Sequence, residues 1–97
     1  MVIVLECTSQ GVERFRCAQT GCAACIRILL REHSGLVYRI VNRVVSWEVE
    51  CADLFQEGRI GLWRAILHYD VGRGAAFSSY ACVVIQHHLR LDHLLIS

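Results

Sequence analysis

The 97-residue sequence contains no proline and no lysine, so all ten of its basic residues are arginine. No proline-rich linker, low-complexity tract or internal repeat divides the chain, which predicts a single domain. No apolar run approaches the ~18 residues that cross a bilayer, which argues against a membrane protein. The opening MVIVLE is too short for a signal peptide. A reducing, cytoplasmic location is therefore expected.

A strong net charge is also absent, because ten arginines nearly balance nine acidic residues and leave a formal charge of +1. The chain therefore lacks the large electrostatic footprint of many nucleic-acid-binding proteins. Arginine suits bidentate contacts with phosphates, carboxylates and partner proteins, although a coding bias explains the lack of lysine equally well. No nucleophile–base pair and no phosphate-binding loop stands out, so an enzyme is not expected.

What the chain has in excess is apolar character, because 55% of its residues are hydrophobic and its mean hydropathy is +0.40. A domain of this size leaves part of such surface uncovered. An interface with another protein is therefore favoured, and self-association is left open.

Apolar residues recur at helical spacing along most of the chain. Helices are expected over residues 23–33, 36–45, about 51–69, and after Ser78, while residues 1–18 are assigned to an N-terminal tail. The expected fold is a compact all-α bundle of three to four helices within residues 19–97. Between the last two helices, DVGRG is typical of a turn, since its glycines tolerate positive φ.

The segment DLFQEGRIGLWRAILHYD, residues 53–70, carries two glycines inside an amphipathic helix. Each costs roughly 1 kcal/mol relative to alanine, which calls for a compensating role. Gly58 shares the apolar face, and its small size predicts close approach of a neighbouring helix. Asp53, Gln56 and Glu57 form a polar cluster within one turn beside that face.

These segments resemble region 2 of the bacterial RNA polymerase sigma factors. LLREHSGLVYRIVNRVV is similar to region 2.1, DLFQEGRIGLWRAILHYD to region 2.2, and GRGAAFSSYACVVIQHHLR to regions 2.3 and 2.4. The resemblance covers roughly residues 19–91, and Asp-Leu-x-Gln-Glu-Gly-x-Ile-Gly-Leu is its most recognisable signature. A chance helical stripe explains the apolar positions, but not these polar residues and glycines together.

The resemblance implies that the third expected helix packs against the clamp coiled coil of the polymerase β′ subunit. By position, this polymerase-binding surface consists of Asp53, Gln56, Glu57, Arg59 and Trp63. Trp63 is the large anchor that interfaces favour, with burial in the core as the alternative. For Glu57 the alternative is a solvated surface carboxylate.

The resemblance also implies contact with the −10 promoter element, chiefly as single-stranded DNA. The corresponding residues are Arg73, Phe77, Tyr80, His87 and Arg90. In the family, the two aromatic positions capture a flipped adenine, and the last two positions read neighbouring bases. Ordinary core packing is the alternative for both aromatic rings.

The sequence departs from the family pattern at several points. Val83 and Val84 replace a tryptophan pair and cannot stack on a base, and His87 replaces the usual glutamine. The helix-turn-helix that reads the −35 element is missing from the 97 residues. Polymerase binding is therefore expected more firmly than promoter recognition.

Six cysteines without an export signal indicate thiols or metal ligands rather than a disulfide framework. A C-x4-C-x2-C run and one later cysteine are candidates for a zinc or iron–sulfur site, namely Cys17, Cys22, Cys25 and Cys51. The favoured alternative is cysteine as a small apolar filler, so no cofactor is expected.

Three functions remain open. The first is a sigma-like domain that docks on RNA polymerase and touches the −10 element. The second is a sigma-like competitor or interaction protein without promoter recognition, and the third is a cysteine-based metal or redox sensor on the same fold. Binding of single-stranded DNA would distinguish the first function from the second, and a bound metal ion would distinguish the third from both.

Overall fold

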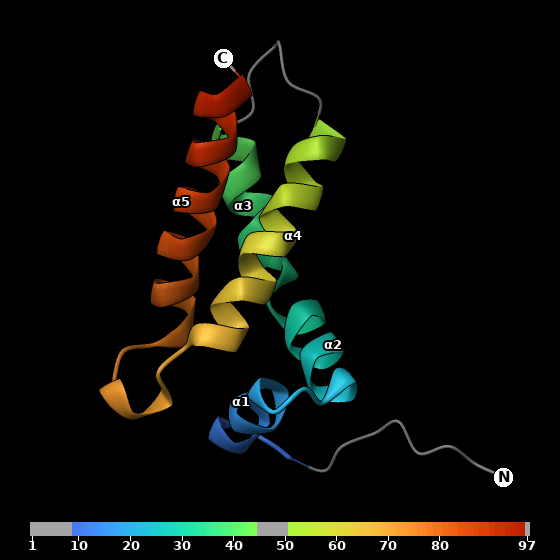
Figure 1. Cartoon of the computed structure of the whole chain (residues 1–97), viewed down its shortest axis with the longest axis vertical. Helices are drawn as coiled ribbons and strands as arrows, with labels where there is room; N and C mark the ends of the chain where they lie inside the picture. Colours follow the sequence, from blue (N-terminus) through green and yellow to red (C-terminus); the bar gives the residue numbers. More distant parts are fainter. Residues whose placement is uncertain (1–8, 45–50, 97) are drawn as a thin grey trace, which may run out of the picture.

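The computed structural model describes residues 9–44 and 51–96, with side chains placed over 9–43 and 53–89. As the sequence predicts, these residues form an all-α bundle (Figure 1). Its elements are α1 (Val12–Gln19), α2 (Ala23–Glu32), α3 (Ser34–Val44), α4 (Cys51–His68), the short 3-10 turn η1 (Val71–Arg73) and α5 (Phe77–Ile96). The described part therefore has five α-helices, more than the three to four expected. Within it, no helix combines the length and apolar character needed to cross a membrane.

The additional helix is α1, and all of it except Gln19 lies in the stretch that the sequence analysis assigns to a tail, residues 1–18. It crosses the lower end of the bundle in Figure 1 and packs against both α2 and α4. Its Ala18 is fully buried, and the ring of Phe15 lies 4.7 Å from that of Phe77 in α5. Residues 12–18 therefore belong to the folded domain.

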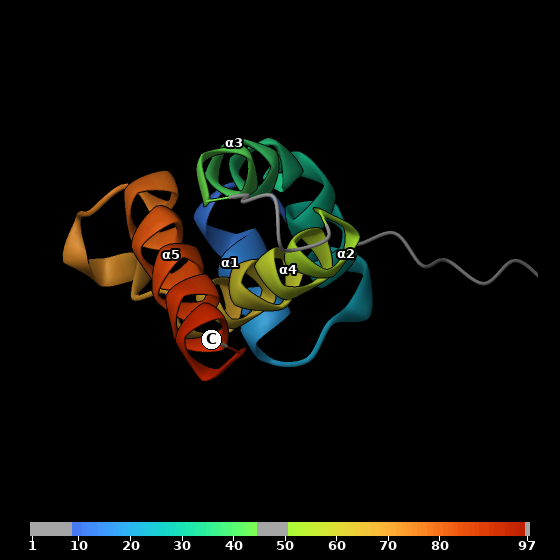
Figure 2. The same ribbon diagram turned by 90° about the horizontal axis from the view of Figure 1, so that it is seen from above.

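The helix α4 packs against both α3 and α5, as the view from above shows (Figure 2). A Cβ atom added at Gly58 would lie 2.7 Å from Cγ1 of Val37, and one at Gly61 would lie 3.2 Å from Cα of Ile85. Both distances are shorter than the ~3.5–4.0 Å at which carbon atoms pack well. The two glycines therefore let both neighbouring helices approach α4 closely, which confirms the close approach predicted from Gly58.

We expect Gly58→Ala to lower the free energy of unfolding by about 1–2 kcal/mol. Overpacking against the buried Val37 outweighs the ~1 kcal/mol that alanine gains in helix propensity. Gly35 is a matched control, because it is also helical and nothing lies within 4 Å of an added Cβ there. Gly35→Ala should instead stabilise by up to about 1 kcal/mol. Urea unfolding followed by circular dichroism measures both, and two effects of the same sign would contradict this account.

Candidate functional site

Four of the five residues expected to bind polymerase are exposed on α4, namely Asp53, Gln56, Arg59 and Trp63. Of the Trp63 surface, 43% is accessible to solvent. Core burial, the alternative for Trp63, is therefore wrong. Ile60 is also exposed and lies between Gln56 and Trp63 at helical spacing. The sequence analysis missed Ile60 because it considered the polar residues of this face separately from the apolar ones. Helical spacing applied to both kinds of residue would have placed Ile60 on the same face.

Glu57 is directed toward α5 rather than outward with these residues. Its Oε1 atom lies 2.9 Å from Nε2 of His88, which is half-buried. This contact joins α4 to α5 inside the domain. A charge reversal at Glu57 would therefore disturb the fold as well as any interface, and it cannot serve as a clean test of binding.

Arg59 lies at the other edge of α4, beside a groove shared with α2 and α3. The groove has a volume of about 580 Å³, and it is lined by Arg27, Leu30, Arg31, Ser34, Val37, Tyr38, Phe55, Gln56 and Arg59. Within the described part of the chain, none of its three arginines forms an ion pair with a carboxylate. The groove is therefore basic and partly aromatic. Arg27 and Arg31 lie far from Arg59 in sequence, and no sequence signal groups them.

Phe77 is not on the surface, since only 7% of its area is exposed. Its ring packs against those of Phe15, His33 and Tyr69, with centroids 4.7, 4.7 and 5.1 Å away. Stacking on a DNA base requires an exposed face. In this structure Phe77 therefore fits the core alternative rather than the base-binding role implied by the resemblance.

His33 is part of the same aromatic cluster. Burial lowers the pKa of His33 from its ordinary value of 6.5, while the nearby Glu32 carboxylate opposes this shift. The unfolded chain therefore binds a proton at His33 more readily than the folded chain does. The contribution of His33 to stability is fully present at a pH above 6.5, and it is lost as the pH falls below about 6.5.

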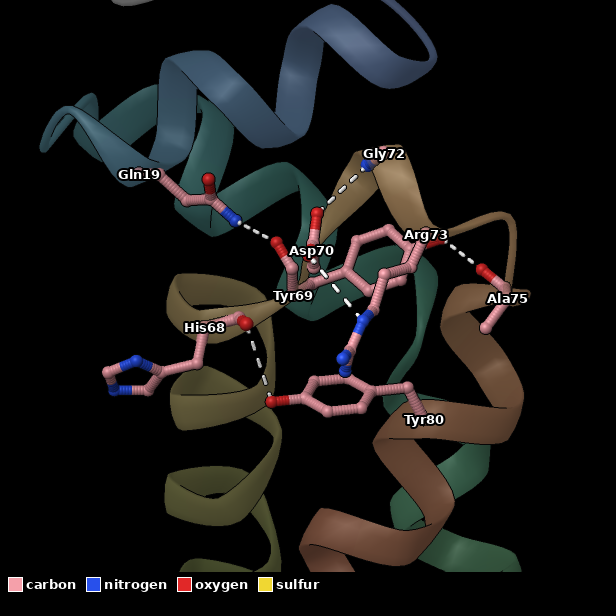
Figure 3. A network of polar contacts seen from close by, with 8 residues as sticks. All are labelled: Gln19, His68, Tyr69, Asp70, Gly72, Arg73, Ala75 and Tyr80. Carbon is pink, nitrogen blue, oxygen red and sulfur yellow. Dashed lines mark hydrogen bonds and ion pairs between the residues drawn. The ribbon is translucent and has the colours of Figure 1, made fainter.

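The turn between α4 and α5 holds the next candidate residue, Arg73 (Figure 3). Asp70 accepts a hydrogen bond from the Gly72 amide at 3.1 Å and lies 3.8 Å from the Arg73 guanidinium. The predicted turn is confirmed, although only Gly74 of its two glycines has a positive φ, at 83°. Arg73 is highly exposed, so its guanidinium is accessible to a phosphate.

A second groove lies between α4 and α5 and has a volume of about 410 Å³. It is lined by Arg64, His68, Tyr80, Val83, Val84, His87 and His88. The Tyr80 hydroxyl donates to the His68 carbonyl oxygen at 3.4 Å, which holds the ring at one end of the groove (Figure 3). The structure therefore brings together Tyr80 and His87, and it adds Arg64 and His68, which the sequence analysis does not single out. The side chain of Arg90 lies outside the described residues.

Three of the four candidate metal ligands lie together where α1 meets α2. The Sγ atoms of Cys17, Cys22 and Cys25 are all within 4.8 Å of one another. The fourth candidate, Cys51, begins α4, and its side chain lies outside the described residues.

Comparison with known proteins places this architecture in a family. Residues 29–94 match the family model described as Sigma-70 region 2. The chain is 38% identical over 61 residues to the RNA polymerase sigma factor FliA of Pseudomonas aeruginosa, covering 60% of this chain and 25% of that protein. It is 32% identical over 73 residues to the RNA polymerase sigma-F factor of Bacillus licheniformis, covering 75% of this chain and 29% of that protein.

The matched residues include the last four residues of α2, all of α3 and α4, and most of α5, but not α1. The chain spans about a quarter of the length of these two relatives. The match covers well over half of the chain and includes both grooves' residues on α4. On this basis, the chain belongs to the Sigma-70 region 2 family.

Proposed function

We propose that this chain docks on core RNA polymerase through the exposed face of α4 and acts in transcription initiation. The observation that carries the proposal is the exposure of Trp63 beside Ile60, Gln56 and Asp53 on the helix that matches region 2.2. The two relatives described above are named as RNA polymerase sigma factors. Such a function places the protein in the cytoplasm, with polymerase.

The chemistry of this face fits a helical protein partner. Interfaces commonly have a large aromatic anchor surrounded by polar groups, and Trp63 with Asp53 and Gln56 provides this arrangement. The adjacent basic groove at Arg59 offers guanidinium groups to acidic side chains of the same partner. We propose the clamp coiled coil of the β′ subunit as that partner.

A binding experiment with an isolated β′ clamp coiled-coil fragment tests this choice of partner. Isothermal titration calorimetry should show a one-to-one complex in the micromolar range, and the Gln56→Ala variant should bind more weakly because an interfacial hydrogen bond is lost. Ser78→Ala, at an exposed position on α5, is the control and should bind normally. Binding to core polymerase without any binding to the fragment would place the contact on another subunit.

We further propose that the α4–α5 groove contacts single-stranded −10 DNA. Tyr80 offers an aromatic ring, Arg64 and Arg73 offer charges for phosphates, and His87 is exposed at the same groove. Base stacking on an aromatic ring contributes ~1–3 kcal/mol per base. Opening of a closed duplex is not expected, because a valine side chain at Val83 has no ring to insert between bases.

Tyr80→Ala should weaken binding to a single-stranded −10-like oligonucleotide by about 5- to 150-fold, the equivalent of one lost stacking contact. Tyr38→Ala is a matched control, since Tyr38 is an exposed tyrosine on α3 outside this groove. Fluorescence anisotropy with single-stranded and duplex oligonucleotides measures both variants, and circular dichroism checks that each is folded. Tight duplex binding, or equal losses for the two tyrosines, would contradict the proposed groove.

Two observations favour a second candidate function, a competitor that binds polymerase without recognising a promoter. Phe77 is covered by Phe15 of α1, and Val83 and Val84 line the groove where the family has tryptophans. Both features reduce the aromatic surface available to bases. Polymerase binding without single-stranded DNA binding would support this second function.

A further inference from the structure

Three cysteine sulfurs meet at the junction of α1 and α2, and none of these cysteines lines either groove. Cys17 lies in the last turn of α1, Cys22 is the N-cap residue of α2, and Cys25 lies in its first turn. Their Sγ atoms lie within 4.8 Å of one another. Tetrahedral zinc with Zn–S bonds of about 2.3 Å places its sulfur ligands ~3.8 Å apart, so small side-chain movements are enough to enclose an ion.

The backbone of the connecting turn holds these cysteines near one another independently of the sulfurs. The amides of Thr20 and Cys22 both donate to the carbonyl oxygen of Cys17, at 3.1 and 3.3 Å. Gly21 has a φ of 102°, a backbone conformation that residues other than glycine rarely adopt. The turn therefore directs the start of α2 back toward Cys17, and part of the ordering needed for a metal site already exists.

The surroundings of the cluster also suit a thiolate–metal complex. Zinc with three thiolates carries a formal charge of −1, and the N-terminus of α2 favours negative charge. The first turn of α2 has no acidic residue that would compete for this position. Cys25 is fully buried, whereas Cys17 and Cys22 are partly exposed, so an ion can enter from the solvent side.

We propose that Cys17, Cys22 and Cys25 bind one Zn²⁺ ion, which joins the end of α1 to the start of α2. Each ligating thiol releases its proton to solvent, and the fourth coordination position is left to a water molecule. The matched family region starts at residue 29, so the site lies in the part of this chain outside that match. The proposal is independent of polymerase binding.

The ion would stabilise the docking of α1 on the rest of the bundle. Gln19, two residues after Cys17, donates through Nε2 to the carbonyl oxygen of Tyr69 at 2.7 Å (Figure 3). The same atom also donates to the carbonyl oxygen of Ile66 at 3.0 Å. Phe15 on the same helix covers Phe77. Fixing the end of α1 therefore supports both of these contacts.

Zinc and cobalt titration of the full chain tests the proposal. Protein stripped by a chelator and kept reduced should bind one Zn²⁺ per chain, with a higher midpoint of thermal unfolding. Co²⁺ as a probe should give thiolate-to-metal charge-transfer absorption and the visible bands of a tetrahedral site, and zinc should abolish both.

Single variants separate this site from adventitious thiol binding. Cys17→Ser and Cys22→Ser, at partly exposed positions, should weaken zinc binding at least tenfold and lose the cobalt spectrum while remaining helical by circular dichroism. Cys82→Ser is the control, because Cys82 is also partly exposed but lies on α5 outside the cluster. Zinc binding that survives the Cys17→Ser and Cys22→Ser double variant, or no tetrahedral cobalt spectrum in the unmodified chain, would overturn the proposal. So would formation of a disulfide in place of metal binding under the same reducing conditions.

Discussion

Replacing Trp63 with alanine is expected to weaken binding to core RNA polymerase by about 2–4 kcal/mol, roughly 30- to 1000-fold. The indole is the largest exposed side chain on the face of α4 and sits among polar groups. Truncation of such an aromatic anchor removes contact area that smaller neighbours cannot replace. Biolayer interferometry with immobilised core polymerase measures the change.

Two controls make this result specific. Val12→Ala alters another exposed apolar residue, half of whose surface is accessible, but on α1. It should leave polymerase affinity unchanged. The unfolding midpoint of Trp63→Ala should also stay within the range of ordinary surface substitutions, about 0.5 kcal/mol. Equal affinity losses for Trp63→Ala and Val12→Ala would remove α4 from the interface.

Phe77→Ala is expected to lower the free energy of unfolding by about 3–5 kcal/mol, as phenylalanine truncation in a core does. The ring contacts three other aromatic side chains, and its removal leaves a cavity beneath α1. For a domain of this size, such a loss approaches the whole stability. Urea unfolding followed by the circular dichroism of the helices measures it.

Trp63→Ala again supplies the comparison, because it truncates a larger ring at an exposed position. A loss of less than about 1 kcal/mol for Phe77→Ala, together with weaker single-stranded DNA binding, would contradict the core role. It would restore the base-binding role that the family resemblance implies.

The long helices could be predicted from sequence, because α4 and α5 are each long enough to repeat an apolar stripe several times. The helix α1 could not, since its eight residues span only about two turns and include several charged residues. Its burial depends on Phe15 and Ala18 finding partners on α4 and α5. Those partners are fixed by how the helices cross, and periodicity within one helix does not reveal them.

The same limit applies to the candidate surfaces. The region 2.2 signature identifies the helix and its polar residues, but not that Glu57 reaches His88 on α5. The signature also does not show that Arg59 shares a groove with Arg27, which lies on α2, 32 residues earlier in the chain. The sequence leaves core and interface roles open for both Trp63 and Phe77. Only the structure shows that Trp63 is exposed and Phe77 is buried.

The most direct test of the central claim is competition between this chain and a full-length sigma factor for core RNA polymerase. Fluorescently labelled chain should bind core enzyme with a dissociation constant of about 1 μM or tighter, and an excess of unlabelled sigma factor should displace it fully. Displacement is expected because, under the proposed function, both proteins occupy the same surface of polymerase. Absence of binding at tens of micromolar, or binding that a saturating sigma factor leaves unchanged, would contradict the proposed docking through α4.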